Sequence, residues 1–117
     1  MRILLILEQL AQFALGIFLI YLSEVHLPWW LWLILFFSPD IGMIGYLINT
    51  RVGAFTYNLL HHKAVAIAVL AFGYFTGDDR VMLAGLLLFA HSSFDRVFGY
   101  GLKYPDAFKH THLGWMK

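Results

Sequence analysis

The chain has 117 residues, of which 61% are hydrophobic and only 13% charged, and its mean hydropathy is +0.72. A soluble domain is typically about 45–50% apolar and roughly 25% charged, and a small domain has too much surface to hide such an excess. The composition excludes a soluble monomer and a disordered chain, and predicts a protein embedded in the lipid bilayer. The absence of cysteine excludes disulfides and thiolate metal sites. The net charge of +1, with scattered basic residues, argues against nucleic acid as a partner.

Four apolar stretches are long enough for membrane-spanning helices, which need about 20 residues each. We expect these helices at about 3–22, 28–48, 54–76 and 81–100. Only short polar breaks separate them, so neighbouring helices should be antiparallel. The predicted fold class is all-α, a bundle of four antiparallel transmembrane helices over residues 1–100, followed by a short polar tail over 101–117. The first stretch contains Glu8 and lacks a small-residue cleavage site, which favours a retained helix over a signal peptide.

The distribution of lysine and arginine predicts the orientation of the bundle. The side that holds both termini carries the basic residues Arg2, Arg51, Lys103, Lys109 and Lys117. The opposite side carries three acidic residues and a single basic one, which are Glu24, Asp78, Asp79 and Arg80. Because basic residues concentrate on the cytoplasmic side, we expect both termini in the cytoplasm.

Polar side chains inside the predicted spans are the most informative feature of the chain. An aspartate at the middle of a spanning helix costs about 2.5–3.5 kcal/mol on insertion scales, so such residues normally mark a functional site. At about 1.5 Å per residue, the predicted depths bring a polar group from every span into the cytoplasmic half of the bilayer. The residues concerned are Glu8, Asp40, Asn58, His61, His62, His91, Asp95 and Arg96.

The spacing within the last span adds detail to this site. His91 and Asp95 are four residues apart and share one helix face. They are therefore expected either to bind one ion together or to form a hydrogen bond that orients the imidazole. Arg96 points about 100° away, since successive helical residues rotate by that angle. Its expected partners are Asp40, Glu8 or the inner lipid headgroups.

The second span and the tail carry further signals. Pro39 should kink the helix beside Asp40 and free backbone carbonyls that then need partners. Gly42 and Gly45 should let a neighbouring helix approach closely. The tail, with His110 and His112, should lie beneath the polar residues, as a solvated segment, as a lid or as the source of a further ligand.

Several blocks of residues carry a resemblance to a known family. They are Glu8, Pro39-Asp40, Gly45-Tyr46, Tyr57-Asn58-Leu59-Leu60-His61, His91-Ser92-Ser93-Phe94-Asp95-Arg96, Gly99-Tyr100-Gly101-Leu102-Lys103-Tyr104-Pro105, Phe108 and Thr111-His112-Leu113. With these blocks the chain resembles the bacterial membrane family known as domain of unknown function 4260. The resemblance implies a small multi-span protein of the inner membrane and favours His61 and His112 over His62 and His110. It implies no activity.

The residues favour an intramembrane metal-dependent hydrolase or transferase that acts on a lipid-like substrate. Asp40, His61, His91 and Asp95 offer the mixed oxygen and nitrogen ligands that suit zinc, manganese or iron. Glu8 or a free carboxylate is the expected base for a metal-activated water, and Arg96 with Lys103 is suited to a phosphate headgroup. The expected supporting residues are Tyr57, Asn58, Tyr100, Lys103 and His112.

Three other functions remain open from the sequence. A small homo-oligomeric transporter or proton-coupled carrier of a small molecule would use the helix broken at Pro39 to line its pathway. A haem or quinone protein would use His61 and His91 as axial ligands. A structural membrane subunit would keep the same residues as a buried ion-pair network.

Overall fold

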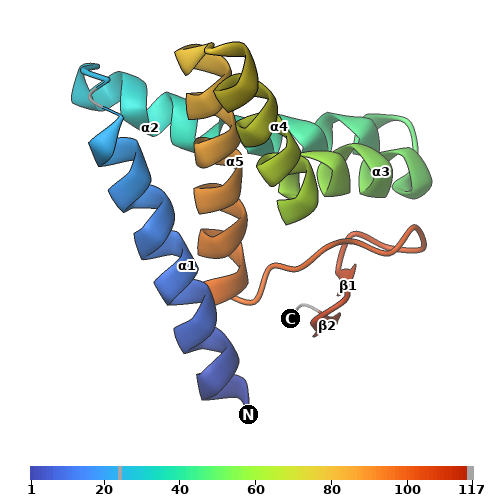
Figure 1. Ribbon diagram of the computed structural model, residues 1–117. Helices are drawn as coiled ribbons and strands as arrows, with labels where there is room; N and C mark the ends of the chain where they lie inside the picture. The colour runs from blue at the N-terminus through green and yellow to red at the C-terminus, as the bar shows by residue number, and fades with distance from the viewer. Residues whose placement is uncertain (24, 116–117) are drawn as a thin grey trace.

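The computed structural model describes residues 1–23 and 25–115, and the predicted all-α class is confirmed (Figure 1). Glu24 and Lys117, which entered the predicted orientation, lie outside the described residues. The helices are α1 (Arg2–Leu22), α2 (Trp29–Phe37), the 3-10 helix η1 (Ser38–Leu47), α3 (Thr50–His61), α4 (Lys63–Thr76) and α5 (Asp79–Val97). In the tail, β1 (His110–Thr111) and β2 (Gly114–Trp115) form a small antiparallel hairpin.

The helix α5 is central to the arrangement. It packs against α1 on one side and α4 on the other, and it runs antiparallel to both (Figure 1). The second layer is a hairpin in which η1 packs along α3, and this hairpin lies across the other helices (Figure 1). The tail leaves the end of α5 and turns back beneath α3, so residues from both layers and the tail meet near the lower half of α5.

The expected set of four regular spans is confirmed only in part. Among the described residues, α1 and the continuous segment Trp29–Leu47 are long and apolar enough to cross a membrane, and α3 with α4 makes a third span if the bent pair counts as one. The expected helix at 54–76 is broken by a 48° bend between α3 and α4. The fourth segment, α5, has 19 residues but carries charged residues at both ends.

His62 is the physical reason for the break between α3 and α4. Its backbone is extended, with φ −88° and ψ 122°, so the α-helical hydrogen bonding of α3 ends at His61. Its side chain then accepts a hydrogen bond from the Ala64 N–H at 3.1 Å and caps the first turn of α4. A side-chain acceptor at this position satisfies one of the N–H groups that every helix start leaves without a partner.

Two glycines allow the close contact between η1 and α3, as the sequence predicted. A Cβ atom placed on Gly42 would lie 2.7 Å from the carbonyl oxygen of Thr56, and one placed on Gly45 would lie 2.7 Å from that of Val52. The hydroxyl of Thr56 donates a hydrogen bond to the carbonyl oxygen of Gly42 across this contact. The contact fixes the position of η1, and therefore of Asp40, relative to α3.

The interior of the protein is unusually polar. The largest side chains buried almost completely among the described residues are His61, His91, Thr111, Ser92 and Ser93. A small apolar cluster around Ile20, Leu86 and Leu87 lies between α1, α2 and α5, whereas many large apolar side chains point outward. This inversion is what a bilayer permits, since lipid tails solvate the apolar surface while polar groups are satisfied inside the protein.

We expect Gly45→Ala to destabilise the protein by about 1–3 kcal/mol, the usual cost of overpacking a close contact. The new methyl group would meet Val52 and Thr56, so η1 must move away from α3. Thermal unfolding in detergent measures the effect. Ile44→Val, on an exposed side chain of the same helix, is the control and should change stability by less than about 0.5 kcal/mol. Equal stability of the two variants would contradict the packing argument.

Candidate metal centre

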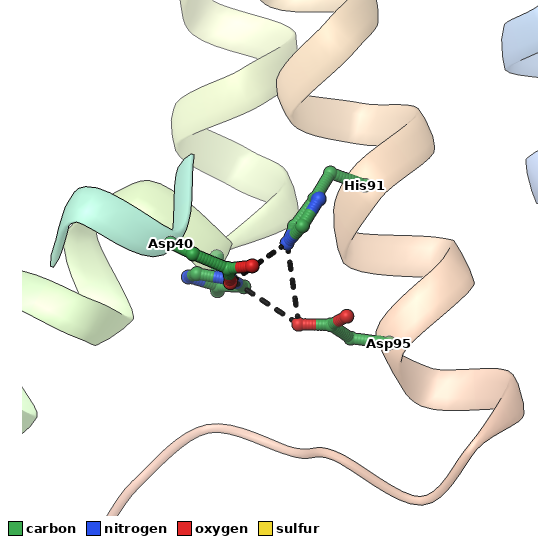
Figure 2. A group of neighbouring side chains, drawn as sticks. Asp40, His91 and Asp95 are labelled. Carbon is green, nitrogen blue, oxygen red and sulfur yellow. Dashed lines mark hydrogen bonds and ion pairs between the residues drawn. The ribbon is translucent and has the colours of Figure 1, made fainter. Parts of the chain in front are cut away.

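Four side chains from three helices converge near the lower half of α5. Asp40 comes from η1, His61 from the end of α3, and His91 and Asp95 from successive turns of α5. One ligand atom from each residue lies within 4.8 Å of all the others. Figure 2 shows Asp40, His91 and Asp95 pointing toward one another across the gap between η1 and α5. The sequence prediction that these four residues meet is therefore confirmed.

The distances define a compact square of two nitrogens and two oxygens. The Nε2 atom of His91 lies 3.1 Å from Asp40 Oδ1 and 3.4 Å from Asp95 Oδ2. The Nε2 atom of His61 lies 3.4 Å from Asp40 Oδ1 and 3.2 Å from Asp95 Oδ2. Each carboxylate oxygen thus faces both imidazoles. The His61 and His91 side chains are buried, and Asp40 is the most accessible of the four, with 37% of its side chain exposed.

The opposite nitrogen of each imidazole is held by a backbone carbonyl. His91 Nδ1 lies 2.7 Å from the carbonyl oxygen of Phe36, and His61 Nδ1 lies 2.9 Å from that of Tyr57. A carbonyl oxygen can only accept, so each Nδ1 carries the hydrogen and donates it. In a neutral imidazole the Nε2 atom then presents its lone pair to the centre. Metal-binding histidines are oriented in the same way in proteins.

The break between α2 and η1 makes the Phe36 carbonyl available. The α-helix ends at Phe37, and a 3-10 helix pairs each carbonyl with the N–H three residues later. The residue three positions after Phe36 is Pro39, which has no N–H to donate. The sequence predicted that Pro39 would free carbonyls that need partners, and the structure pairs the Phe36 carbonyl with His91.

Tyr57 contacts both His61 and Asp95. Its ring stacks on the His61 imidazole with centroids 3.9 Å apart and planes 7° apart. Its hydroxyl donates a hydrogen bond of 3.3 Å to Asp95 Oδ2. Tyr57 was expected as a supporting residue, and the structure places it in direct contact with two members of the centre.

Asn58 ties the tail to α3 next to the centre. Its side-chain amide donates to the Lys103 carbonyl at 2.7 Å and accepts from the Lys103 N–H at 2.6 Å. The Lys103 ammonium then lies over the rings of Tyr57 and Phe108, with 5.0 Å and 3.9 Å to the ring centroids. Burial lowers the pKa of Lys103 from its ordinary value. The tail is therefore anchored to α3 through the buried Lys103, whereas residues 104–106, 108–109 and 112–115 are exposed.

The comparisons with known proteins identify a family. A family model described as Domain of unknown function (DUF4260) matches residues 2–116. The chain belongs to this family. No curated protein and no solved structure matches the chain. Membership in DUF4260 brings no activity with it, so any function has to be argued from the centre itself.

Two residues expected at the site lie away from the square of ligand atoms. Glu8 is exposed on α1, and the charge it influences is that of Lys63. Arg96 forms no ion pair with Asp40 or Glu8 among the described residues. It donates instead to the backbone carbonyls of His61 at 3.2 Å and Ser92 at 3.4 Å.

The remaining supporting residues belong to the tail connection. The Tyr100 side chain is partly exposed, and its backbone N–H donates to the Asp95 carbonyl at 2.8 Å. His112 Nδ1 accepts from the Leu102 N–H at 2.8 Å, so this imidazole closes a turn of the tail and is not a ligand in the square. Partial burial and the positive charge of Arg96 lower the pKa of His112 below its ordinary value of 6.5.

Sequence reasoning missed one polar group that the structure brings together. The Lys63 ammonium donates to the side-chain oxygens of Gln9 and Gln12, which are three residues apart on α1. The i, i+3 spacing of two glutamines inside an apolar helix was the available signal, because such residues share one face. Lys63 directly follows the break at His62. Because no sequence signal indicated that break, Lys63 was not recognised as the first residue of a helix.

Asn58→Ala should release the tail, because it removes both hydrogen bonds to the Lys103 backbone. Limited trypsin digestion in detergent measures this as faster cleavage after Lys103, which is 5% exposed. Cleavage after the exposed Lys109 is the internal reference and should change little. Asn49→Ala, which removes only the exposed cap of α3, is the control variant. An unchanged ratio of the two cleavages in Asn58→Ala would contradict the tethering role.

Proposed function

We propose that this protein binds one divalent metal ion through Asp40, His61, His91 and Asp95 and hydrolyses, or transfers a group from, a lipid-like substrate within the membrane. One observation carries the proposal. Two carboxylate oxygens and two imidazole lone pairs meet within 4.8 Å, while both Nδ1 hydrogens are donated away from them. When the imidazoles are neutral, these four atoms are all acceptors that repel one another, and a metal ion at their centre, like a second proton on each imidazole, removes that repulsion.

The donor set fits a first-row metal. Two imidazole nitrogens with two carboxylate oxygens suit zinc, manganese or iron(II) better than calcium or magnesium, which favour oxygen ligands. A bound metal of this kind lowers the pKa of a coordinated water toward neutrality and polarises the substrate oxygen. The geometry does not suit a haem, because Asp40 and Asp95 lie between the two imidazoles, where the porphyrin plane would have to pass.

The residues around the centre have distinct roles in this proposal. The backbone-bound His61 and His91 hold their lone pairs inward, and Tyr57 fixes Asp95. Asp40 is the most accessible member and marks the side from which water and substrate reach the centre. Its second carboxylate oxygen takes the proton from the attacking water as the new bond forms and returns it to the leaving-group oxygen as the ester bond breaks. Glu8 is exposed on α1 and is not a member of this group, so it does not take this role.

The proposed setting is a four-span bundle in a bacterial inner membrane with both termini in the cytoplasm. The lysine and arginine distribution supports this orientation, and the shared lower position of the N-terminus and the tail fits it (Figure 1). In this setting the ligand square lies in the cytoplasmic half of the bilayer. A lipid-like substrate then enters sideways from the inner leaflet.

Elemental analysis of the purified protein tests the metal. We expect about one equivalent of zinc, manganese or iron, and His91→Ala should lower the affinity by at least about 10–100-fold, the range for losing even an outer partner of a ligand. His26→Ala is the matched control, because His26 is an exposed histidine outside the group. A metal-free wild-type protein whose thermal stability does not respond to added metal or chelator contradicts the proposal.

A proton-coupled carrier is the second candidate, favoured by the helix breaks. The chain changes from α-helix to 3-10 helix just before Asp40 and breaks just after His61, and discontinuous helices line the ion sites of many transporters. Two protons on the imidazoles would also satisfy the four acceptors. Such a carrier needs a homo-oligomer to enclose its pathway.

Proton flux in proteoliposomes separates the carrier from the metal enzyme. For a carrier, a pH gradient should collapse faster with the wild-type protein than with Asp40→Asn, because Asp40 is the accessible member of the group. Asp79→Asn, at the exposed start of α5, is the control and should retain the flux. Equal rates for wild type, Asp40→Asn and empty vesicles would contradict the carrier. If the protein also binds no metal, the hypothesis that remains is a structural membrane subunit.

A further inference from the structure

Two cationic side chains near the centre have only neutral partners. Arg96 donates to the carbonyl oxygens of His61 and Ser92, and Lys63 donates to the side-chain oxygens of Gln9 and Gln12. Among the described residues, neither cation has a carboxylate oxygen within 4.0 Å. An intramembrane cation is costly and is normally paired with an opposite charge or with backbone carbonyls.

The acidic groups nearby form no direct ion pair with these cations. Glu8 attracts Lys63 and Asp95 attracts Arg96 from more than 4.0 Å away, and Asp95 also accepts a hydrogen bond from Tyr57. Lys63 and Arg96 are also close enough to repel each other. The region between α1, the start of α4 and the end of α5 therefore carries two positive charges that have no direct ion pair among the described residues.

A cavity of about 960 Å³ opens next to this charge. It lies between the first turns of α1, the last turns of α5 and the tail, and Arg2 and Arg96 both line it. Gln9, which binds Lys63, forms part of the same wall. No aspartate or glutamate is among the described lining residues.

The rest of the cavity wall is largely apolar. Leu5 and Ile6 line it from α1, Val97 from α5, and Leu113 from the tail. A cavity lined by two arginines and several apolar side chains matches an amphiphile that has an anionic head and a hydrocarbon chain. Phosphate fits better than a single carboxylate, because two arginines can engage several phosphate oxygens with paired N–H groups.

We propose that this cavity binds the phosphate headgroup of an anionic lipid between Arg96 and Arg2. The lipid chain leaves along the apolar wall toward the bilayer. Arg96 also donates to the carbonyl of the metal-ligand candidate His61, so a bound headgroup lies beside the metal centre. That this lipid is the substrate rests on the proposed function, whereas its binding does not.

Trp115 lines the cavity and provides a local reporter. The other three tryptophans, Trp29, Trp30 and Trp32, are on α2 and can be replaced by phenylalanine. In this background, titration with dihexanoyl phosphatidic acid in detergent should change the fluorescence of Trp115. The affinity obtained from this titration should be at least about tenfold higher than that for dihexanoyl phosphatidylcholine. Both headgroups form charge-assisted hydrogen bonds through their phosphate. The affinity for phosphatidylcholine is lower because the arginines repel its choline cation.

Arg96→Gln should weaken phosphatidic acid binding about tenfold, and Arg96→Lys should restore part of it. Arg80→Gln, at the exposed start of the same helix, is the matched control and should bind as the parent does. Arg2→Gln provides a second variant that leaves the contact with His61 untouched. Equal affinity for the two lipids, or unchanged binding in both Arg96→Gln and Arg2→Gln, overturns the proposal. Inorganic phosphate that binds as tightly as phosphatidic acid overturns the lipid assignment.

Metal content measured on the same samples separates the two proposals. Selective phosphatidic acid binding by a metal-free protein supports the headgroup site and contradicts the proposed metal function. A metal-loaded protein without lipid selectivity supports the metal function and overturns the headgroup site. Arg96 directly follows Asp95 in the sequence, so its substitution can also disturb the metal centre. For this reason metal content is measured in Arg2→Gln as well. Full metal content in that variant shows that its loss of lipid binding does not come from a disrupted centre.

Discussion

The arrangement of this protein depends on two hydrogen bonds from imidazoles to backbone carbonyls. The carbonyls of Phe36 and Tyr57 take the Nδ1 hydrogens of His91 and His61, and this fixes which nitrogens face Asp40 and Asp95. Reversed imidazoles would place N–H groups opposite the carboxylates and give an ordinary buried hydrogen-bond network. With neutral imidazoles the centre has four facing acceptors, which are stable together only when a metal ion or added protons lie between them.

The irregular backbone supplies one of the two carbonyls that orient the imidazoles. A carbonyl that a helix break leaves without its own N–H partner is available to a side chain from another helix. The switch to a 3-10 helix at Ser38 leaves the Phe36 carbonyl for His91, and the break after His61 leaves the His61 carbonyl for Arg96. Backbone of this kind is tolerated at membrane depth only where protein surrounds it. The breaks therefore connect the ligand square directly to the cationic cavity.

Sequence reasoning predicted the group of four neighbouring residues because its signals were strong and local. Asp40, His61, His91 and Asp95 are all costly inside an apolar span, and the i, i+4 spacing on α5 fixed a common face for two of them. Glu8 satisfied the same depth criterion, but depth alone does not give the rotation of α1, and that helix turns Glu8 outward. The predicted depths therefore identified which residues could meet and only partly which residues do.

Other features had no comparable local signal. The break at His62 has neither proline nor glycine in the segment Asn58-Leu59-Leu60-His61-His62-Lys63, and it depends on a histidine that acts as a helix cap. The partners of Arg96 are carbonyls released by that break, so they could not be predicted before the break was known. The tail is held by Asn58, whose bonds join residues 45 positions apart. Contacts of this range follow from the folded topology rather than from spacing.

The polar interior also links the stability of this protein to what it binds. The apolar cluster is small, and the best-buried side chains include both imidazoles, so apolar packing supplies little that compensates for repulsion in the centre. A ligand that binds only the folded state adds its binding free energy to folding. A cation in the ligand square and an anion beside Arg96 would each relieve an excess of one sign of charge. The break after His61 places the two sites next to each other. Because their proposed occupants have opposite charges, each would favour the binding of the other.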